Sequence, residues 1–195
     1  MFIIVAGPES SGTRIFTKAI ASHPDIVGSD GSHSDYFDSA WKGGEFPDVK
    51  NGVTRRSYPH GKDGGVAKYC DYESMHGIIN SAKKSHDVIV LIPVRAVYPH
   101  LASWTMNRAS VKGEFQKACF QYQSAYQFIL SQCHFTNTPF WFLSLEALND
   151  DYMETLFDLC GLAPFRPGIS YNGSDDKHYE HFKLLRTADS NRKLA

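Results

Sequence analysis

The stretch FIIVAGPESSGTRIF, residues 2–16, decides the fold of this chain. Its first part, FIIVA, is apolar and partly β-branched and ends at a Gly-Pro pair, a pattern typical of a buried strand in a parallel sheet. Beyond the turn, apolar residues return at helical spacing until Pro24 ends the pattern. A strand, a glycine-containing turn and a helix form the first half of an α/β unit. We therefore expect a three-layer α/β fold in which helices flank a central, mostly parallel β-sheet.

Further strands and helices are predicted from the remaining apolar patterns. The run DVIVLIPV, residues 87–94, is the strongest strand signal and is expected to be central in the sheet, and residues 139–148 predict another buried strand. Helices are expected over residues 70–86, 99–106, 114–132 and 151–160, with Gly161 ending the last one. The aromatic residues of the helix over 114–132 are expected in the core.

Residues 28–65 are rich in Gly, Ser, Asp, His and Pro, so this segment is expected to be dominated by loops. A long irregular segment in a compact domain is more often functional than idle. Arg55, Arg56 and His60 in this segment either bind an anionic ligand or form a solvated charge cluster.

Length and charge limit the class of protein. At 195 residues the chain suits one domain over residues 1–195, with a polar tail from about residue 170 that packs partly and frays. The formal net charge of −1 gives no overall basic field for nucleic acid or an anionic membrane surface, so neither is expected as a partner. Any anion site is therefore local.

Cysteine usage and apolar run length point to the compartment. The four cysteines are scattered without a CxxC pair, which predicts neither a zinc site nor a disulfide scaffold, and no metal is expected. The apolar run at residues 2–6 is too short for a signal peptide, and no stretch approaches the roughly 20 apolar residues of a membrane helix. We expect a cytoplasmic protein.

The turn after the first strand has the spacing of a phosphate-binding loop, from Gly7 to Gly12. Such a turn directs backbone N–H groups and the positive end of a helix dipole at a bound anion. The small residues Ser10 and Ser11 allow close approach, and the hydroxyls of Ser11 and Thr13 can donate to phosphate or sulfate oxygens. Thr13 stands where a nucleotidase has its lysine, which disfavours ordinary ATP or GTP hydrolysis; a simple tight turn stays an alternative.

A second basic feature follows the strand at residues 87–94. Arg95 comes directly after this strand, and Ser103 follows eight residues later. In an open α/β sheet, residues just past the carboxyl ends of strands line the ligand crevice. The guanidinium of Arg95 can bind a phosphate through two nitrogens, and Ser103 can join it on the same anion.

At these residues the sequence resembles the sulfotransferases that use 3'-phosphoadenosine 5'-phosphosulfate (PAPS), a family with a P-loop-type fold. SSGT, residues 10–13, is similar to the family's PxSGTT loop for the 5'-phosphosulfate, and Arg95 with Ser103 matches its pair for the 3'-phosphate. Residues 22–28 and 143–148 are similar to two further segments, an HPxI segment and a YEDL strand end, in the same order along the chain. The resemblance implies a donor site made by Ser10, Ser11, Gly12, Thr13, Arg14, Arg95 and Ser103.

The resemblance also implies two catalytic roles. The family carries Lys or Arg directly before SGT, where the charge stabilises the leaving group, whereas this chain has Ser10. Arg14 either supplies that charge from the other side of the loop or points to solvent. Alignment of DYFD, residues 35–38, with the end of the family's KExxFFD segment puts His33 at the position of the general base, with Asp35 as the fallback. Alternatively, His33 is simply one of the chain's nine histidines, in a polar loop.

The expected activity is transfer of a sulfuryl group from PAPS to a hydroxyl or amine of a small-molecule or carbohydrate acceptor. Two alternatives stay open, a P-loop kinase for a nucleotide or small molecule and a non-catalytic nucleotide-binding module. Glu146, within the segment similar to the family's strand end, either orients loop residues or caps a helix.

Overall fold

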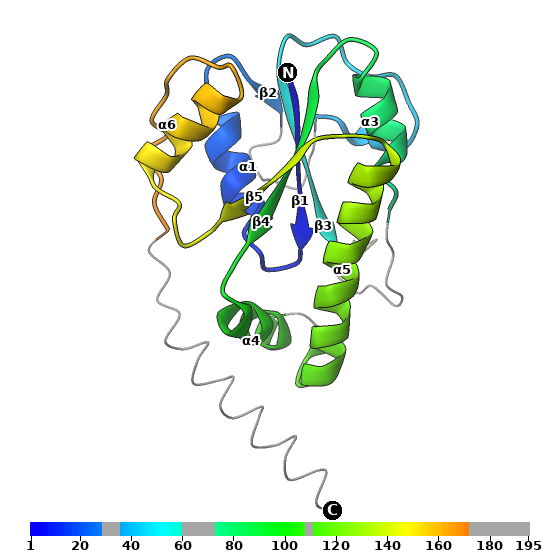
Figure 1. The fold of residues 1–195 in the computed structure, drawn as a ribbon, viewed down its shortest axis with the longest axis vertical. Helices are drawn as coiled ribbons and strands as arrows, with labels where there is room; N and C mark the ends of the chain where they lie inside the picture. Colours follow the sequence, from blue (N-terminus) through cyan, green and yellow to red (C-terminus); the bar gives the residue numbers. More distant parts are fainter. Residues whose placement is uncertain (29–35, 60–72, 108–110, 172–195) are drawn as a thin grey trace, which may run out of the picture.

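The computed structural model describes residues 1–28, 36–59, 73–107 and 111–171 (Figure 1). Its centre is a five-stranded sheet with the strand order β2-β3-β1-β4-β5, in which every pair of neighbours is parallel. The strands are β1 (Phe2–Pro8), β2 (Val27–Gly28), β3 (Gly52–Tyr58), β4 (Val88–Val94) and β5 (Phe140–Ser144). The expected α/β fold with a parallel sheet between helices is confirmed.

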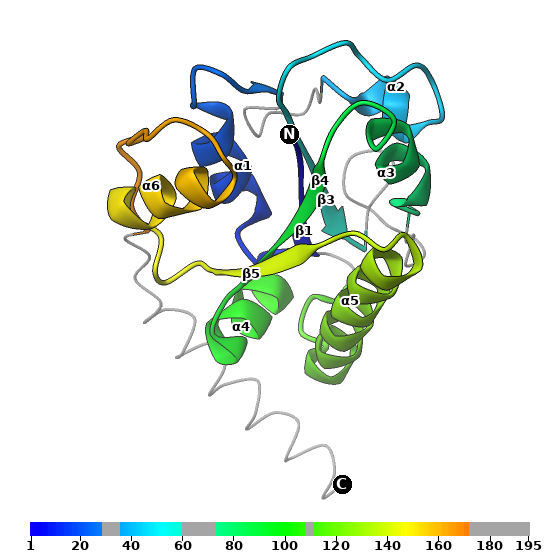
Figure 2. The same ribbon diagram turned by 45° about the horizontal axis from the view of Figure 1, so that its top comes forward.

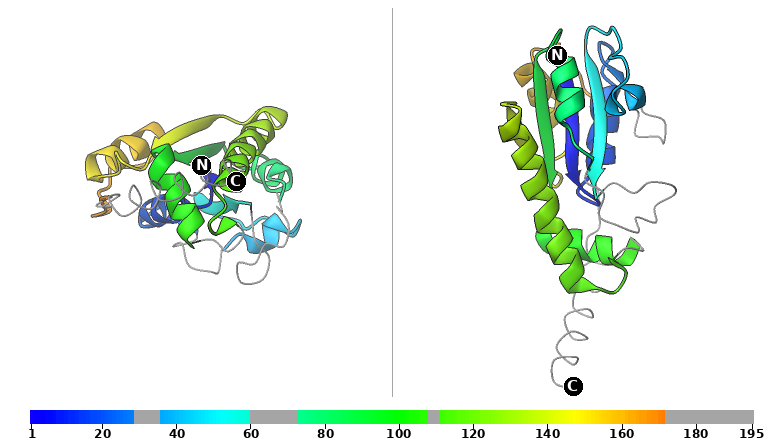
Figure 3. Two further views of the ribbon diagram at one scale, coloured as in Figure 1. Left: turned by 90° about the horizontal axis from the view of Figure 1, so that it is seen from below. Right: turned by 90° about the vertical axis from the view of Figure 1, so that its right-hand side faces the viewer.

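In the described ranges, six helices accompany the sheet, and all except α4 divide between its two faces (Figure 2). They are α1 (Thr13–Ala21), α2 (Asp38–Trp41), α3 (His76–Ala82), α4 (Val97–Asn107), α5 (Phe115–Phe135) and α6 (Asp150–Leu159). Helices α1 and α6 pack against one face, while α2, α3 and α5 pack against the other. Helix α4 lies beyond the carboxyl ends of the strands, so a view from below shows it in front of them (Figure 3).

Strand β1 is apolar throughout because it lies in the middle of the sheet. Alternate residues point to opposite faces, so Phe2 and Ile4 enter the core beside α3 and α5, while Ile3 and Val5 enter the core beside α1 and α6. Strand β3 pairs with one side of β1 and β4 pairs with the other. The carboxyl ends of these three strands therefore lie next to one another at the same end of the sheet, where the loop after β1 begins.

The prediction that residues 28–65 are dominated by loops is wrong for β3. This strand, GVTRRSY, lies inside the sheet between β1 and β2, yet its run of four polar residues, 54–57, interrupts the apolar pattern of a buried strand. Distant partners satisfy those polar groups. The Trp41 indole N–H donates to Thr54 Oγ1 over 2.8 Å, and Arg56 pairs with Glu73 over 2.8 Å.

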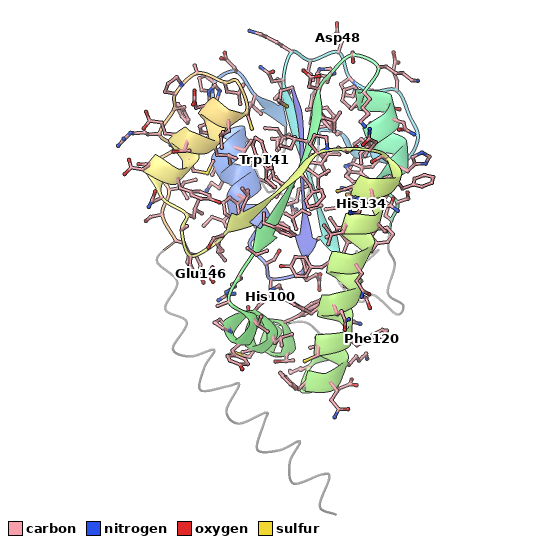
Figure 4. The ribbon with its side chains drawn as sticks, in the orientation of Figure 1. Asp48, His100, Phe120, His134, Trp141 and Glu146 are labelled. Carbon is pink, nitrogen blue, oxygen red and sulfur yellow. The ribbon has the colours of Figure 1, made fainter. Side chains whose placement is uncertain are left out.

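Two further predictions need correction. Strand β5 is an edge strand rather than a buried one, since it pairs only with β4 among the described strands and Phe142 is 52% exposed. An apolar run of five residues has the same pattern at the edge of a sheet as inside it. The aromatic residues of α5 are likewise not all in the core, because Phe120 is 69% exposed near the end of the helix that extends past the sheet (Figure 4).

Candidate functional site

The loop between β1 and α1 turns through two residues with positive φ. Ser10 has a φ of 67°, and Gly12, the N-cap of α1, has a φ of 103°. A Cβ at Gly12 would lie 2.9 Å from Leu145 Cδ1, and the positive φ strains any other residue, so this position favours glycine. The first amides of a helix have no acceptor within the helix, and the N-cap Gly12 has no side chain to accept from them. The start of α1 can therefore donate hydrogen bonds to a bound anion.

The hydroxyl of Ser11 is buried without a hydrogen-bond partner among the residues that the structure describes. The side chain folds back over Gly7, where a Cβ would lie 2.5 Å from Ser11 Oγ. Buried hydroxyls are nearly always hydrogen-bonded, and leaving one unpaired costs about 1–3 kcal/mol. Ser11 Oγ is thus a donor held inside the loop that a ligand oxygen could satisfy.

Thr13 connects the loop to the neighbouring strand β3. Its Oγ1 lies 2.6 Å from Ser57 Oγ, and its side chain is 4% exposed. Either hydroxyl can be the donor, so Thr13 keeps a hydrogen for an anion only when Ser57 donates to it. Ser57 therefore controls how Thr13 takes part in the site.

Arg95 reaches the loop from the end of β4. Its Nη1 donates to the carbonyl oxygen of Ser10 over 3.5 Å, across 85 residues of sequence. The side chain is 9% exposed, and the ring of Tyr171 lies 5.8 Å from its guanidinium carbon. A guanidinium with low solvent access thus lies directly beside the loop between β1 and α1, residues 9–12, in a chain of net charge −1. This loop is called the anion loop below.

Helix α4 contributes the next residues of the site. His100 Nε2 lies 2.6 Å from the carbonyl oxygen of Glu9, and Figure 4 shows His100 on the side of α4 that faces the strand ends. Ser103 is one turn further along α4 and is 8% exposed, so it belongs to the same side of the helix. Arg95 and Ser103 are both buried, and Arg95 also contacts the loop through the Ser10 carbonyl.

Burial of His100 decides its charge. Transfer out of water lowers the pKa of this imidazole to about 4, the hydrogen bond to the Glu9 carbonyl opposes that shift, and the positive charge of Arg95 adds to it. His100 is therefore neutral at pH 7. Because the carbonyl can only accept, the proton of the neutral ring lies on Nε2.

Of the two residues expected to have catalytic roles, the described ranges include Arg14, which is not part of this buried arrangement. Arg14 is exposed on the first turn of α1. His33 and its alternative Asp35 lie outside the described residues, as does His60. Arg56 is buried in ion pairs with Glu73 and Asp38, so it does not form a solvated charge cluster.

Glu146 orients the start of α4. Its Oε1 accepts a hydrogen bond of 2.7 Å from the Ala96 amide, and its Oε2 accepts one of 3.2 Å from the Ser144 hydroxyl. The negative charge of this carboxylate also interacts favourably with the positive end of the α4 dipole. The bond to Ala96, which precedes α4, agrees with the interpretation that Glu146 orients loop residues, and the contact fixes the backbone next to Arg95.

Three residues of the site were not predicted from the sequence: Ser57, His100 and Tyr171. His100 stands between Arg95 and Ser103 in the sequence, and that position was its one available signal. Ser57 follows two arginines in a strand whose pattern was obscured, and Tyr171 approaches Arg95 from a segment far along the chain. Neither has a local pattern that marks it.

No protein-family model matches the chain, and a search of curated proteins finds no match. None of the helices in the described ranges is long and apolar enough to cross a membrane. Those same ranges contain no group of three or more His, Cys, Asp or Glu residues able to hold a metal ion.

Proposed function

We propose that this chain is a sulfotransferase that moves the sulfuryl group of PAPS to a hydroxyl or amine of a small-molecule or carbohydrate acceptor. The observation that carries the proposal is the contact between Arg95 and the loop at Ser10, over 3.5 Å. It joins the two sequence features that resemble the phosphosulfate and 3'-phosphate sites of PAPS-dependent enzymes.

The donors at the site fit an anionic nucleotide. The unpaired hydroxyl of Ser11 and the first amides of α1 suit the oxygens of a phosphosulfate. Arg95 supplies a planar pair of N–H donors, the geometry that binds phosphate through two bonds, and Ser103 adds a hydroxyl. PAPS would bring an activated sulfuryl group to this site.

The roles of the residues follow from this arrangement. The loop from Ser10 to Thr13 would hold the phosphosulfate in place while the acceptor attacks the sulfur atom in line. The fixed donors of the loop would stabilise the negative charge that develops in the transition state. Arg95 and Ser103 would bind the 3'-phosphate. His33 would take the acceptor proton, and Arg14 would stabilise the leaving phosphate from the first turn of α1.

One observation favours a second candidate, a nucleotide-binding module without activity. Ser10 carries no charge, and the side chain of Arg14 is exposed rather than buried in the loop. In that case the chain binds the same nucleotide and transfers nothing. A kinase is less well supported, because the loop has no lysine for the β- and γ-phosphates.

Calorimetry with 3',5'-bisphosphoadenosine and with ATP plus Mg²⁺ tests the class of nucleotide. We expect tight binding of the bisphosphate without Mg²⁺ and weak binding of ATP. Preference for ATP with Mg²⁺ would contradict the proposal and indicate a kinase. Sulfate transfer from PAPS to a panel of hydroxyl and amine acceptors then separates an enzyme from a binding module.

Substitution of Arg95→Ala tests the residue that joins the two features. We expect the affinity for 3',5'-bisphosphoadenosine to fall roughly 10- to 100-fold, because a hydrogen-bonded charge at a phosphate contributes about 1.5–3 kcal/mol. Arg166→Ala is the matched control, since this arginine is 62% exposed and pairs with carboxylates on α6. Unchanged affinity of the Arg95→Ala variant would remove the basis of the proposal.

A further inference from the structure

We propose that His100 is a positioning residue that fixes the anion loop by donating a hydrogen bond from Nε2 to the carbonyl of Glu9. The inference rests on the proposed function, because it concerns the loop that would hold the phosphosulfate. It adds a residue that no part of the sequence resemblance includes.

Glu9 is held from two sides. Its amide N–H donates to the carbonyl of Tyr58 at the end of β3 over 2.9 Å, and its carbonyl accepts from His100 Nε2 over 2.6 Å. The next carbonyl, that of Ser10, accepts from Arg95 over 3.5 Å. Two consecutive carbonyls of the loop are therefore held by side chains that come from the end of β4 and from α4.

The bond from His100 also sets the direction of an amide. In a trans peptide the C=O and the following N–H point to opposite sides. When His100 holds the Glu9 carbonyl, the Ser10 N–H is directed to the other side of the loop. Ser10 has a φ of 67°, a conformation that residues other than glycine rarely adopt, so an external bond at this peptide helps to maintain it.

The surroundings of the ring keep it in one orientation. His100 is fully buried, stacks on Trp104 at a centroid distance of 5.7 Å and meets the edge of Tyr122 of α5 at 4.9 Å. Its Nδ1 has no hydrogen-bond partner among the described residues. A second proton on the ring would therefore be buried and unpaired, since the loop offers a carbonyl only to Nε2.

The charges around the ring act in the same direction. The described groups that face it are the Arg95 guanidinium beside the loop, the Glu9 carbonyl, Trp104 on α4 and the Tyr122 phenol on α5, whose own pKa is raised by burial. Protonated His100 would be repelled by Arg95 while both hold adjacent carbonyls. The pKa of about 4 for His100 is consistent with this arrangement. The loop should therefore keep its geometry through neutral pH. In acid, burial and the charge of Arg95 should drive the protonated ring from its position, so the Glu9 carbonyl loses its donor.

Two variants separate the hydrogen bond from the packing of the ring. His100→Phe keeps an aromatic ring and removes the N–H, while His100→Gln keeps an N–H donor at the same number of bonds from the backbone. We expect His100→Phe to bind 3',5'-bisphosphoadenosine roughly 10-fold more weakly and to exchange the amide hydrogens of residues 9–13 faster. His100→Gln should restore both values to within about threefold of those of the wild-type protein.

Equal affinity and equal exchange in His100→Phe and the wild-type protein would overturn the inference. Equal loss in the Phe and Gln variants would also overturn it, because the ring rather than the N–H would then matter. If wild-type protein binds neither the bisphosphate nor inorganic sulfate, the proposed function fails. The exchange rates of residues 9–13 in the two variants still decide the role of His100.

A measurement on the wild-type protein alone removes any dependence on the folding of the variants. Inorganic sulfate keeps its charge between pH 7 and pH 4, so its affinity reports on the loop. We expect constant affinity from pH 7 to about pH 5 and a fall as the pH approaches the pKa of about 4. A fall centred near pH 6.5, the ordinary value for histidine, would contradict a buried neutral ring.

Discussion

At the scale of single residues, the anion loop depends on polar atoms whose partners are missing or distant. Ser11 buries a hydroxyl with no partner in the described part of the chain, whereas Thr13 shares its hydroxyl with Ser57 on another strand. A protein of marginal stability keeps an unpaired buried donor at a cost, so such an atom in a loop is a mark of ligand binding. The sequence marked Ser11 by its position in SSGT, and the structure adds the reason why it can bind.

Ser11→Ala should separate stability from binding. Removal of an unpaired buried hydroxyl should leave the free energy of unfolding unchanged or raise it by about 1 kcal/mol, while the affinity for 3',5'-bisphosphoadenosine falls. Urea unfolding and calorimetry measure the two effects. Ser22→Ala is the matched control, because the Ser22 hydroxyl donates to the Ala19 carbonyl over 2.6 Å. A clear loss of stability in Ser11→Ala would show that its hydroxyl has a partner in the folded protein.

The positive charge near Ser10 also depends on single residues. The PAPS-dependent enzymes that the sequence resembles have a basic residue at this position, and here a guanidinium instead reaches the Ser10 carbonyl from the end of β4. Arg14, the residue that the sequence offered as a replacement, is exposed. Besides its proposed role at the 3'-phosphate, Arg95 is therefore a source of positive charge for the loop in addition to Arg14.

At the scale of elements, helix α6 shows which features of a helix can be read locally. Asn149 caps its N-terminus by accepting from the Tyr152 amide over 2.8 Å, and Asp150 and Asp151 lie in its first turn. Gly161, with a φ of 68°, follows its C-terminus as predicted. Asp150 Oδ1 also accepts from the Gly168 amide over 2.8 Å, so the helix anchors the segment that leads to Tyr171 above Arg95.

Asn149→Ala should lower the free energy of unfolding by about 1 kcal/mol, because it leaves the Tyr152 amide without its acceptor. Asn149→Asp keeps an oxygen acceptor at the same place and should change stability by only a few tenths of a kcal/mol. Urea unfolding followed by circular dichroism compares the two variants. If the alanine variant is as stable as the aspartate variant, the cap does not contribute.

At the scale of the whole molecule, a buried arginine joins elements that are far apart in the sequence. Arg56 of β3 pairs with Glu73 at 2.8 Å and with Asp38 of α2 at 3.4 Å, and its guanidinium carbon lies 4.1 Å from the ring centroid of Trp41. Because the Arg56 side chain is 7% exposed, its charge depends on these partners. The contacts of Arg56 hold β3 in the sheet near the strand ends at which the anion loop begins.

Arg56→Ala should destabilise the fold by about 2 kcal/mol, since it removes a buried arginine from its partly exposed carboxylate partners and from a cation–π contact. Arg166→Ala removes two ion pairs of similar length from a side chain that is 62% exposed, and its effect on stability should be much smaller because solvent screens these pairs. Urea unfolding of both variants gives the comparison. Equal effects would mean that burial adds nothing to the contribution of Arg56.

The sequence by itself determined the elements whose pattern is local. β1 and β4 are apolar runs in the interior of the sheet, and α1 and α6 carry helical spacing with a proline or glycine at the end. The loop at residues 10–13 and the spacing from Arg95 to Ser103 also came from the sequence. Neighbouring residues alone produce these signals, so one chain is enough to read them.

Only the tertiary structure decided the features that depend on distant partners. β3 is inside the sheet because Trp41 and Glu73 satisfy its polar side chains, and β5 is at the edge because no described strand pairs with its outer side. The contacts of Arg95 and His100 with the loop cross 85 and 91 residues. Strand order and the packing of α4 bring these groups together, and neither is encoded in the spacing of any single segment.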